Sequence, residues 1–279
     1  MQNKPQTKTL LLTFALLAIT QPLRAHHSPS EVIQALTERI QSDKPTPKLL
    51  TRRADEYRAL RNPKLAIADY HAALKLNNTY TPAIYGLAKT HLANKQYQAA
   101  LKITQSGIQT ATTPDQAAPF HALAAQAHKT LGHGEAASAA WDQALASTNP
   151  EIDWYLSKAS LLQQTGPPEQ APKFLAQAQQ KNPSTVLKRA WLEALITSGD
   201  TKTPAPHIEA GLDRSRWKSS WLLLRAQLHL ANQNPTAAHQ DTQAALQEIN
   251  TRLTPNTKNP YLLAAKKQAQ AILQNTTTP

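Results

Sequence analysis

The fold is decided by a segment in the middle of the chain, HALAAQAHKTLGHGEAASAAWDQA, which runs from His121 to Ala144. Before the Leu131–Gly134 turn, small and apolar residues recur at intervals of three, four and seven, which places them on one side of a helix. After the turn, Ala137, Trp141 and Ala144 continue with the same kind of spacing. The segment therefore predicts two amphipathic helices that are joined by a tight polar turn.

The same pattern recurs along the chain. Each copy has a polar turn, then a small residue, a larger residue four positions later and another small residue three positions after that. The spacing between successive copies is 34, 37, 34 and 67 residues, for unit starts at Pro47, Thr81, Ala118, Ile152 and Ser219. The last step is close to two units, which predicts a degenerate fifth unit over about 186–218. An insert at 111–116 accounts for the longer step, and we expect it to be poorly ordered.

This organisation resembles the tetratricopeptide repeat family, whose unit is a helix–turn–helix of about 34 residues. In the family's fold, small residues lie where the paired helices touch. The alanines that carry the resemblance are Ala54, Ala88, Ala125, Ala159 and Ala226 before the turns, and Ala66, Ala100, Ala137, Ala171 and Ala238 after them. The resemblance covers roughly residues 47–252 and implies an all-α solenoid of about six units.

The two ends of the repeat region predict capping helices. Ser28-Pro29-Ser30-Glu31 is a capping box, so a helix and linker are expected over 26–46. Asn259-Pro260 begins a segment with apolar residues on one side, which predicts a capping helix and tail over 253–279. We expect residues 44–47 and 275–279 to be poorly ordered.

The first 25 residues have the organisation of a secretory signal peptide. A basic start with Lys4 and Lys8 precedes the apolar run Leu10–Ile19, and Ala25 offers a small residue for cleavage. Removal of this segment, which also contains Arg24, lowers the net charge from +12 to +9. The sequence therefore predicts a periplasmic or secreted protein without an integral membrane span after cleavage.

The composition excludes several kinds of chemistry. The chain has no cysteine and only 7 glycines, so it has no thiolate ligands and little material for phosphate-binding loops. The sequence contains no GxSxG or HExxH motif. We predict no enzyme activity and no cofactor. Nucleic acid is not expected as a partner, because the chain is exported and its aromatic residues are scarce and scattered.

The histidines suggest one open alternative. His91, His128 and His229 occupy equivalent places in their units, roughly 8–10 Å apart per helix spacing, whereas zinc–nitrogen bonds are about 2 Å long. We therefore expect these three side chains to pack in the core with a hydrogen bond. Cleavage after Ala25 would leave His26 with a free amine beside His27, which is a possible copper or nickel chelate.

Basic residues are dense between 44 and 75, in the first unit. The resemblance implies that the first helix of each unit lines a concave groove. Candidate partner-binding residues in that groove are Lys48, Arg52, Tyr85, Lys89 and Lys129, with Asp55, Arg58 and Gln126 beside them. The residues by which the family binds chaperone tails are not reproduced, because Thr51 and Asp55 stand where Lys and Asn would be needed.

The predicted function is an exported scaffold that binds a protein or an acidic peptide segment through a partly basic groove. A cationic face that holds anionic cell-wall or lipopolysaccharide components is the alternative from another class. Metal binding at His26 and His27 is the third hypothesis. Neither the repeats nor the charges indicate an oligomeric state.

Overall fold

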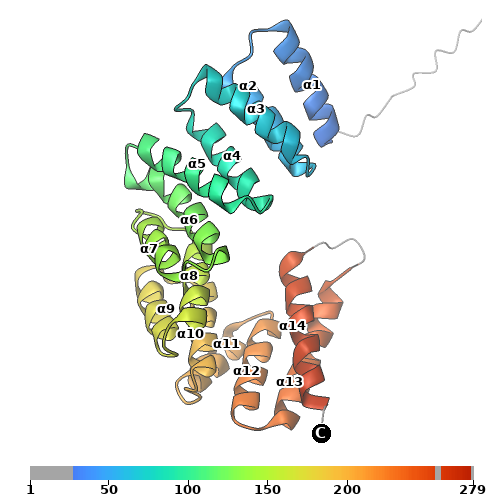
Figure 1. Cartoon of the computed structure of the whole chain (residues 1–279). Helices are drawn as coiled ribbons and strands as arrows, with labels where there is room; N and C mark the ends of the chain where they lie inside the picture. Colours follow the sequence, from blue (N-terminus) through green and yellow to red (C-terminus); the bar gives the residue numbers. More distant parts are fainter. Residues whose placement is uncertain (1–27, 255–258, 278–279) are drawn as a thin grey trace, which may run out of the picture.

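The computed structural model describes residues 28–254 and 259–277. Within these ranges the chain forms fourteen α-helices and no strand, arranged as a curved array of antiparallel pairs (Figure 1). In chain order the helices are α1 (Pro29–Ser42), α2 (Pro47–Ala59), α3 (Pro63–Leu76), α4 (Thr81–Ala93), α5 (Tyr97–Thr110), α6 (Pro114–Thr130), α7 (Gly134–Leu145), α8 (Ile152–Thr165), α9 (Gln170–Lys181), α10 (Thr185–Thr197), α11 (Pro204–Arg214), α12 (Ser219–Ala231), α13 (Pro235–Arg252) and α14 (Pro260–Thr277).

Helices α2 to α13 form six successive pairs, and each pair packs against the next. Helix α1 packs on α2 at one end, while α14 packs on α12 and α13 at the other. The predicted all-α solenoid is confirmed. Four first helices begin at Pro47, Thr81, Ile152 and Ser219, and the pair α10 and α11 occupies the region of the degenerate fifth unit.

The predicted disorder of residues 111–116 is wrong. Helix α6 begins at Pro114, four residues before the expected unit start, and Thr113 Oγ1 accepts a hydrogen bond from the Gln116 amide at 3.2 Å. Asp115 accepts hydrogen bonds from the Thr148 amide at 2.7 Å and hydroxyl at 2.6 Å. A threonine cap, a proline in the first turn and an acidic residue stabilise a helix start. The additional residues therefore lengthen the helix.

Side-chain caps stabilise the starts of the first two helices, α1 and α2. Glu31 Oε2 accepts from the Ser28 amide at 2.7 Å, and Ser28 Oγ accepts from the Glu31 amide at 3.3 Å, so the predicted capping box is confirmed. Thr46, within the linker expected to be poorly ordered, caps α2 by accepting from the Leu49 amide at 3.2 Å. Helix α14 continues to Thr277, two residues beyond the expected start of the tail.

The repeat alanines form the contacts between helices. Nine of the ten that carry the pattern are fully buried at 0 % exposure, and Ala159 is 4 % exposed. A methyl side chain allows the helix axes to approach closely, whereas a larger one separates them. Bulky side chains fill the remaining space between pairs, and the largest buried ones include Trp141, Tyr70 and Phe120.

The turns inside five of the six pairs share one backbone motif, and the turn between α8 and α9 is the exception. The second residue of the turn has a left-handed backbone conformation. In three turns this residue is Arg61, Lys95 or Gln233, with φ of 56°, 60° and 58°, and in two others it is a glycine. In the first unit, the Asn62 amide donates to the Tyr57 carbonyl at 2.8 Å, which closes the end of α2. This six-residue hydrogen bond satisfies an otherwise unpaired helix carbonyl. Its recurrence fixes the sharp reversal from the first helix to the second.

Two ion pairs join the helices of the first and last units at the same relative positions. Arg53 on α2 makes two hydrogen bonds to Asp69 on α3, at 2.7 and 2.8 Å. Arg225 on α12 does the same with Asp241 on α13, again at 2.7 and 2.8 Å. Both aspartates are 8 % exposed. The pairs therefore connect two helices of one unit across a nearly buried boundary.

Candidate functional site

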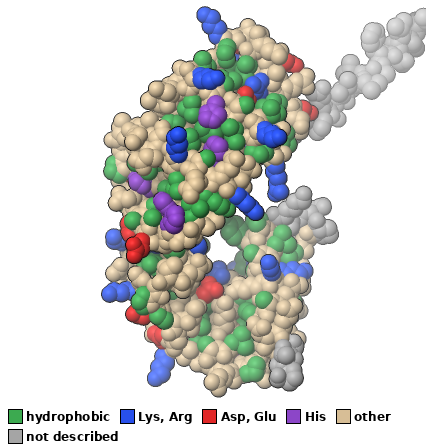
Figure 2. All heavy atoms as spheres, in the orientation of Figure 1, with side chains coloured by type: hydrophobic (Ala, Val, Ile, Leu, Met, Phe, Trp, Pro, Cys, Tyr) green, Lys and Arg blue, Asp and Glu red, His purple; other side chains and the backbone are tan. Residues whose placement is uncertain are grey.

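The concave side of the array is formed by the first helices of the units. Figure 1 shows α4, α6, α8 and α10 on the inner side of the curve and α5, α7 and α9 on the outer side. The space-filling view is hollowed near its centre, with Lys and Arg side chains beside the opening (Figure 2). A cavity of about 490 Å³ lies between α4, α6 and α8, and we call it the central groove. Its lining residues are Tyr85, Lys89, Leu92, Ala93, Pro119, Ala122, Leu123, Gln126, Glu151, Asp153, Trp154 and Ser157.

Tyr85 is the aromatic residue on the α4 side of the central groove. Its ring packs edge-on against Phe120, with 5.9 Å between the centroids and 81° between the planes. Lys89 Nζ lies 5.7 Å from the centroid of the Tyr85 ring, within reach of a cation–π interaction. Burial raises the pKa of the Tyr85 hydroxyl, and Glu151 raises it further. The phenol is therefore neutral at physiological pH and can donate a hydrogen bond to a ligand.

The opposite wall of the central groove is acidic. Glu151 and Asp153 lie at the start of α8 and are both exposed. Trp154, at 8 % exposure, and Ala122, at 3 %, provide an apolar floor between the two walls. An apolar floor with a few polar groups on its rim is typical of binding sites. The groove carries a cation on the α4 side and two carboxylates on the α8 side.

The predicted groove residues do not all meet in one place. Tyr85 and Lys89 line the central groove together with Gln126. Lys129 lies beyond it, where its Nζ is 3.3 Å from Ser160 Oγ on α8. Lys48 and Arg52 are exposed on α2 and do not line the central groove. They belong to the preceding unit, and the step between units carries α2 away from α6 and α8.

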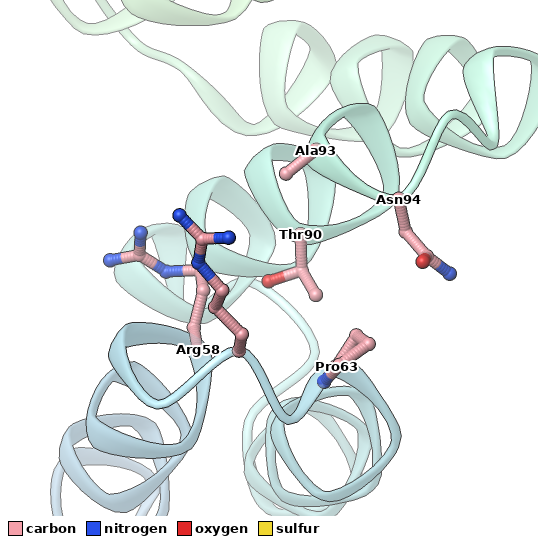
Figure 3. Close-up of a pocket in the computed structure, with 6 residues that line it drawn as sticks. Arg58, Pro63, Thr90, Ala93 and Asn94 are labelled. Carbon is pink, nitrogen blue, oxygen red and sulfur yellow. The ribbon is translucent and has the colours of Figure 1, made fainter.

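A second cavity, of about 410 Å³, lies between the turn of the first unit and α4. It is lined by Arg58, Pro63, Thr90, Ala93 and Asn94, which Figure 3 labels, and by Arg61.

A polar cluster beside this second cavity restrains Arg58. Its guanidinium donates to Asp55 at 3.2 Å and to the Tyr70 hydroxyl at 3.4 Å, while that hydroxyl donates to Asp55 at 2.6 Å. Burial raises the pKa of Tyr70, and the hydrogen bond to Asp55 acts in the same direction. The position of Asp55 and Arg58 in the unit placed both beside the predicted groove residues. It did not reveal the contact with Tyr70 on α3.

The three equivalent histidines are half-buried, not packed in the core as expected. His91 Nδ1 lies 2.7 Å from Gln96 Oε1, and His229 Nε2 lies 3.5 Å from Asp241 Oδ2. The buried Nδ1 of His128 has no hydrogen-bond partner among the described residues, and its ring lies 5.7 Å from that of His133. The histidines stand at the ends of first helices, where the turn leaves one edge of the ring open to solvent.

The two histidines of α6 predict a pH-dependent stability. Burial lowers the pKa of His121 and of His128, and His133 lowers that of His128 further. The unfolded chain then binds protons more readily than the folded one, because its histidines titrate near pH 6.5. The associated stability is present above that pH and is lost as the pH falls through the folded-state pKa values. Urea unfolding at pH 7.5 and 5.5 should show lower stability at pH 5.5, and His121→Gln with His128→Gln should reduce the difference. An unchanged difference in the double variant would contradict this assignment.

The described residues contain no group of three or more His, Asp or Glu side chains placed to hold a metal ion. None of the helices in 28–254 and 259–277 is both long and apolar enough to cross a membrane. His26 and His27 and the predicted signal peptide at 1–25 lie outside the described residues.

Comparison with known proteins supports the repeat assignment. The family model described as tetratricopeptide repeat matches residues 57–127. Among curated proteins, no sequence matches this chain.

Solved structures give matches over most of the chain. The pilus biogenesis factor PilW is 17% identical over 83% of this chain and 98% of its own, with a TM-score of 0.56. A tetratricopeptide repeat protein from Parabacteroides merdae is 14% identical over 87% of this chain and 99% of its own, with a TM-score of 0.52. A chain of the APC/C complex Cut9-Hcn1 is 12% identical over 90% of this chain, with a TM-score of 0.55, and the match spans only 46% of that chain. Residues 57–127 are therefore similar in sequence to the tetratricopeptide repeat family, and over most of its length the chain has the fold of the solved proteins named above.

Proposed function

We propose that the protein is a non-catalytic scaffold that binds an extended segment of a partner protein in the central groove. The observation that carries this proposal is a single cavity lined by the first helices of three successive units. Stacked helix pairs hold such a groove in shape before the partner arrives, so binding requires little ordering of the scaffold.

The charges on the two walls suggest how the partner segment is oriented. Lys89 on the α4 side attracts an acidic residue, and the exposed Lys48 and Arg52 extend this basic character toward the first unit. Glu151 and Asp153 on the α8 side attract a basic residue. Complementary charges of this kind set register and association rate more than affinity. The partner segment therefore carries its acidic end toward the first unit and a basic residue near α8.

A site-specific photo-crosslinker tests this function in the native cells. Gln126 is exposed and lines the central groove, whereas Gln105 is exposed on the outer helix α5. A benzophenone side chain at position 126 should capture a partner, and the same group at position 105 should not. Lys89→Glu should reduce the yield of that crosslink about tenfold, since a favourable charged contact becomes a repulsive one.

Lys102→Glu provides the matched control for this substitution. Lys102 is exposed on α5 and its reversal changes the net charge by the same amount. The crosslink at position 126 should survive Lys102→Glu. Equal crosslinking from positions 105 and 126, or equal loss in the two charge variants, would contradict binding in the central groove.

The cellular location and the alternative ligands also remain proposals. The basic, apolar and small-residue segments within residues 1–25 support export to the periplasm or the outside of the cell.

The exposed Lys48, Arg52 and Arg61 favour anionic cell-wall or lipopolysaccharide components as the second candidate ligand. Binding by charge alone collapses as ionic strength rises, whereas binding in a packed groove persists. Copper or nickel binding at His26 and His27 is tested by titration of the mature chain with and without those side chains.

A further inference from the structure

A cavity of about 400 Å³ lies at the far end of the array, away from the central groove. It is open to solvent on one side and is lined by α10, by the segment that leads from α11 into α12, by the end of α13 and by α14. Its polar lining includes Arg189, Arg252, Ser220 and Gln268, and its apolar lining includes Leu262 and Ala265. We call it the C-terminal pocket. Its volume is within the range of about 300–1,000 Å³ that small ligands occupy.

Arg189 is the unusual group in the C-terminal pocket. Its Nε is buried and has no hydrogen-bond partner in the part of the chain that the structure describes. Burial lowers the pKa of its guanidinium, and Glu193 one turn further along α10 opposes this effect. The Glu193 carboxylate accepts a hydrogen bond from Gln227 at 3.2 Å instead. The side chain as a whole is half-buried, and a partly buried guanidinium without a hydrogen-bonded partner is costly in the folded state.

The second arginine of the C-terminal pocket is held in place. The Arg252 guanidinium lies over the Trp217 ring, 4.5 Å from its centroid, and Arg252 Nη1 is 3.4 Å from Glu248 Oε1. Glu248 in turn accepts from the Lys218 amide at 2.8 Å and the Ser219 amide at 3.0 Å. Because Glu248 already offsets the charge of Arg252, the charge that lacks a hydrogen-bonded partner is that of Arg189.

We propose that the C-terminal pocket binds the carboxylate of a ligand whose flat or apolar body rests on Leu262 and Ala265. The planar guanidinium fork of Arg189 matches a carboxylate in shape and charge, and such paired hydrogen bonds are among the strongest in proteins. A single guanidinium without a partner is neutralised by a single negative charge. A carboxylate has one negative charge, so it is favoured over a doubly charged phosphate. The apolar lining beside it favours an aromatic or aliphatic group next to that carboxylate. The site shares no residue with the central groove, so it stands independently of the proposed function.

N-acetyl-phenylalanine and its neutral amide are the probes that test this site. The acid should shift the Nε–Hε resonance of Arg189 in nitrogen-detected spectra and raise the melting temperature, and the amide should do neither. Arg189→Gln should weaken binding of the acid by about tenfold or more, which corresponds to one charged hydrogen bond. Arg214→Gln is the matched control, because Arg214 is exposed on α11 outside the pocket.

Two further comparisons distinguish a free acid from a chain terminus and check that Arg189 variants fold. A hexapeptide that ends in phenylalanine, compared with its amidated form, shows whether a chain terminus binds as well as the free acid. Arg189→Met should fold with at least the stability of the original chain, because it removes a half-buried charge that has no hydrogen-bonded partner. Equal binding of acid and amide, unchanged binding in Arg189→Gln, or tighter binding of methyl phosphate would overturn the carboxylate assignment.

Discussion

Replacing Gly107 by alanine should destabilise the protein by about 3 kcal/mol, near the upper end of the cost of overpacking a core. Helix propensity alone predicts the opposite sign, because alanine is favoured over glycine inside a helix by about 1 kcal/mol. A Cβ at Gly107 would lie closer than 3.0 Å to three atoms of the Phe120 ring. That ring is 1 % exposed and packs against Tyr85, so it cannot move without disturbing the central groove.

Equilibrium urea unfolding checks this result, with Gly134→Ala as the matched control. Gly134 is the first residue of α7, and a Cβ there would meet its nearest neighbour at an ordinary 3.6 Å. Gly134→Ala should change the free energy of unfolding by less than about 1 kcal/mol. Gly86→Ala should behave like Gly107→Ala, since its Cβ would collide with the buried Tyr70 ring. A stability of Gly107→Ala equal to or above that of the original chain would contradict this account of the helix contacts.

Asp241→Ala should lower the free energy of unfolding by about 2–3 kcal/mol, the range for loss of a charged hydrogen-bonded partner. Asp241 accepts both hydrogen bonds of the Arg225 fork and is almost completely buried. The effect is smaller than for a fully buried pair, because the Arg225 side chain is 28% exposed and also contacts Glu209 at 3.1 Å. Asp69→Ala should have a similar effect, since Arg53 keeps only a hydrogen bond to Thr37 at 3.1 Å.

A double-mutant cycle separates the pair from its surroundings. Asp241→Ala, Arg225→Met and the combination should show a coupling of about 1–2 kcal/mol between the two side chains. Asp213→Ala is the control, because Asp213 is exposed on α11. Additive effects of the two substitutions would show that the pair does not join α12 to α13, and a loss as large in Asp213→Ala would point to net charge instead.

Local patterns along the chain predicted much of the fold. The alanine spacing located the helix contacts, and the Ser28–Glu31 motif located the start of the first capping helix. The error at 111–116 came from treating extra residues as a loop, although Thr113 and Pro114 are themselves helix-start signals. The sequence did not predict the left-handed backbone conformation of Arg61, Lys95 and Gln233. Glycine is the residue type that usually signals this conformation, and none of these three positions is a glycine.

The candidate sites were harder to predict. Tyr85 and Lys89 were placed in a groove by their positions in the unit, but the opposing Glu151 and Asp153 were not foreseen. The pairs Arg53–Asp69 and Arg225–Asp241 have the same separation of 16 residues. Spacing along one helix does not reveal this regularity, because the two residues of each pair lie on different helices. Nothing in the sequence indicated that Arg189 would lack a hydrogen-bonded partner. An arginine on a helix face is common, and only the positions of its neighbours in space show whether it is paired.

By itself, the sequence determined the helix–turn–helix unit, its repetition and the small residues at the contacts. These features depend on spacing along one or two helices, where 3.6 residues per turn relate position directly to direction. Only the tertiary structure decided which charged side chains share a groove and which cation is left without a partner. Those properties depend on the rotation from one unit to the next and on burial by α14, which bring together residues from helices distant in the chain. Local spacing contains no information about that rotation, and the binding surfaces follow from it.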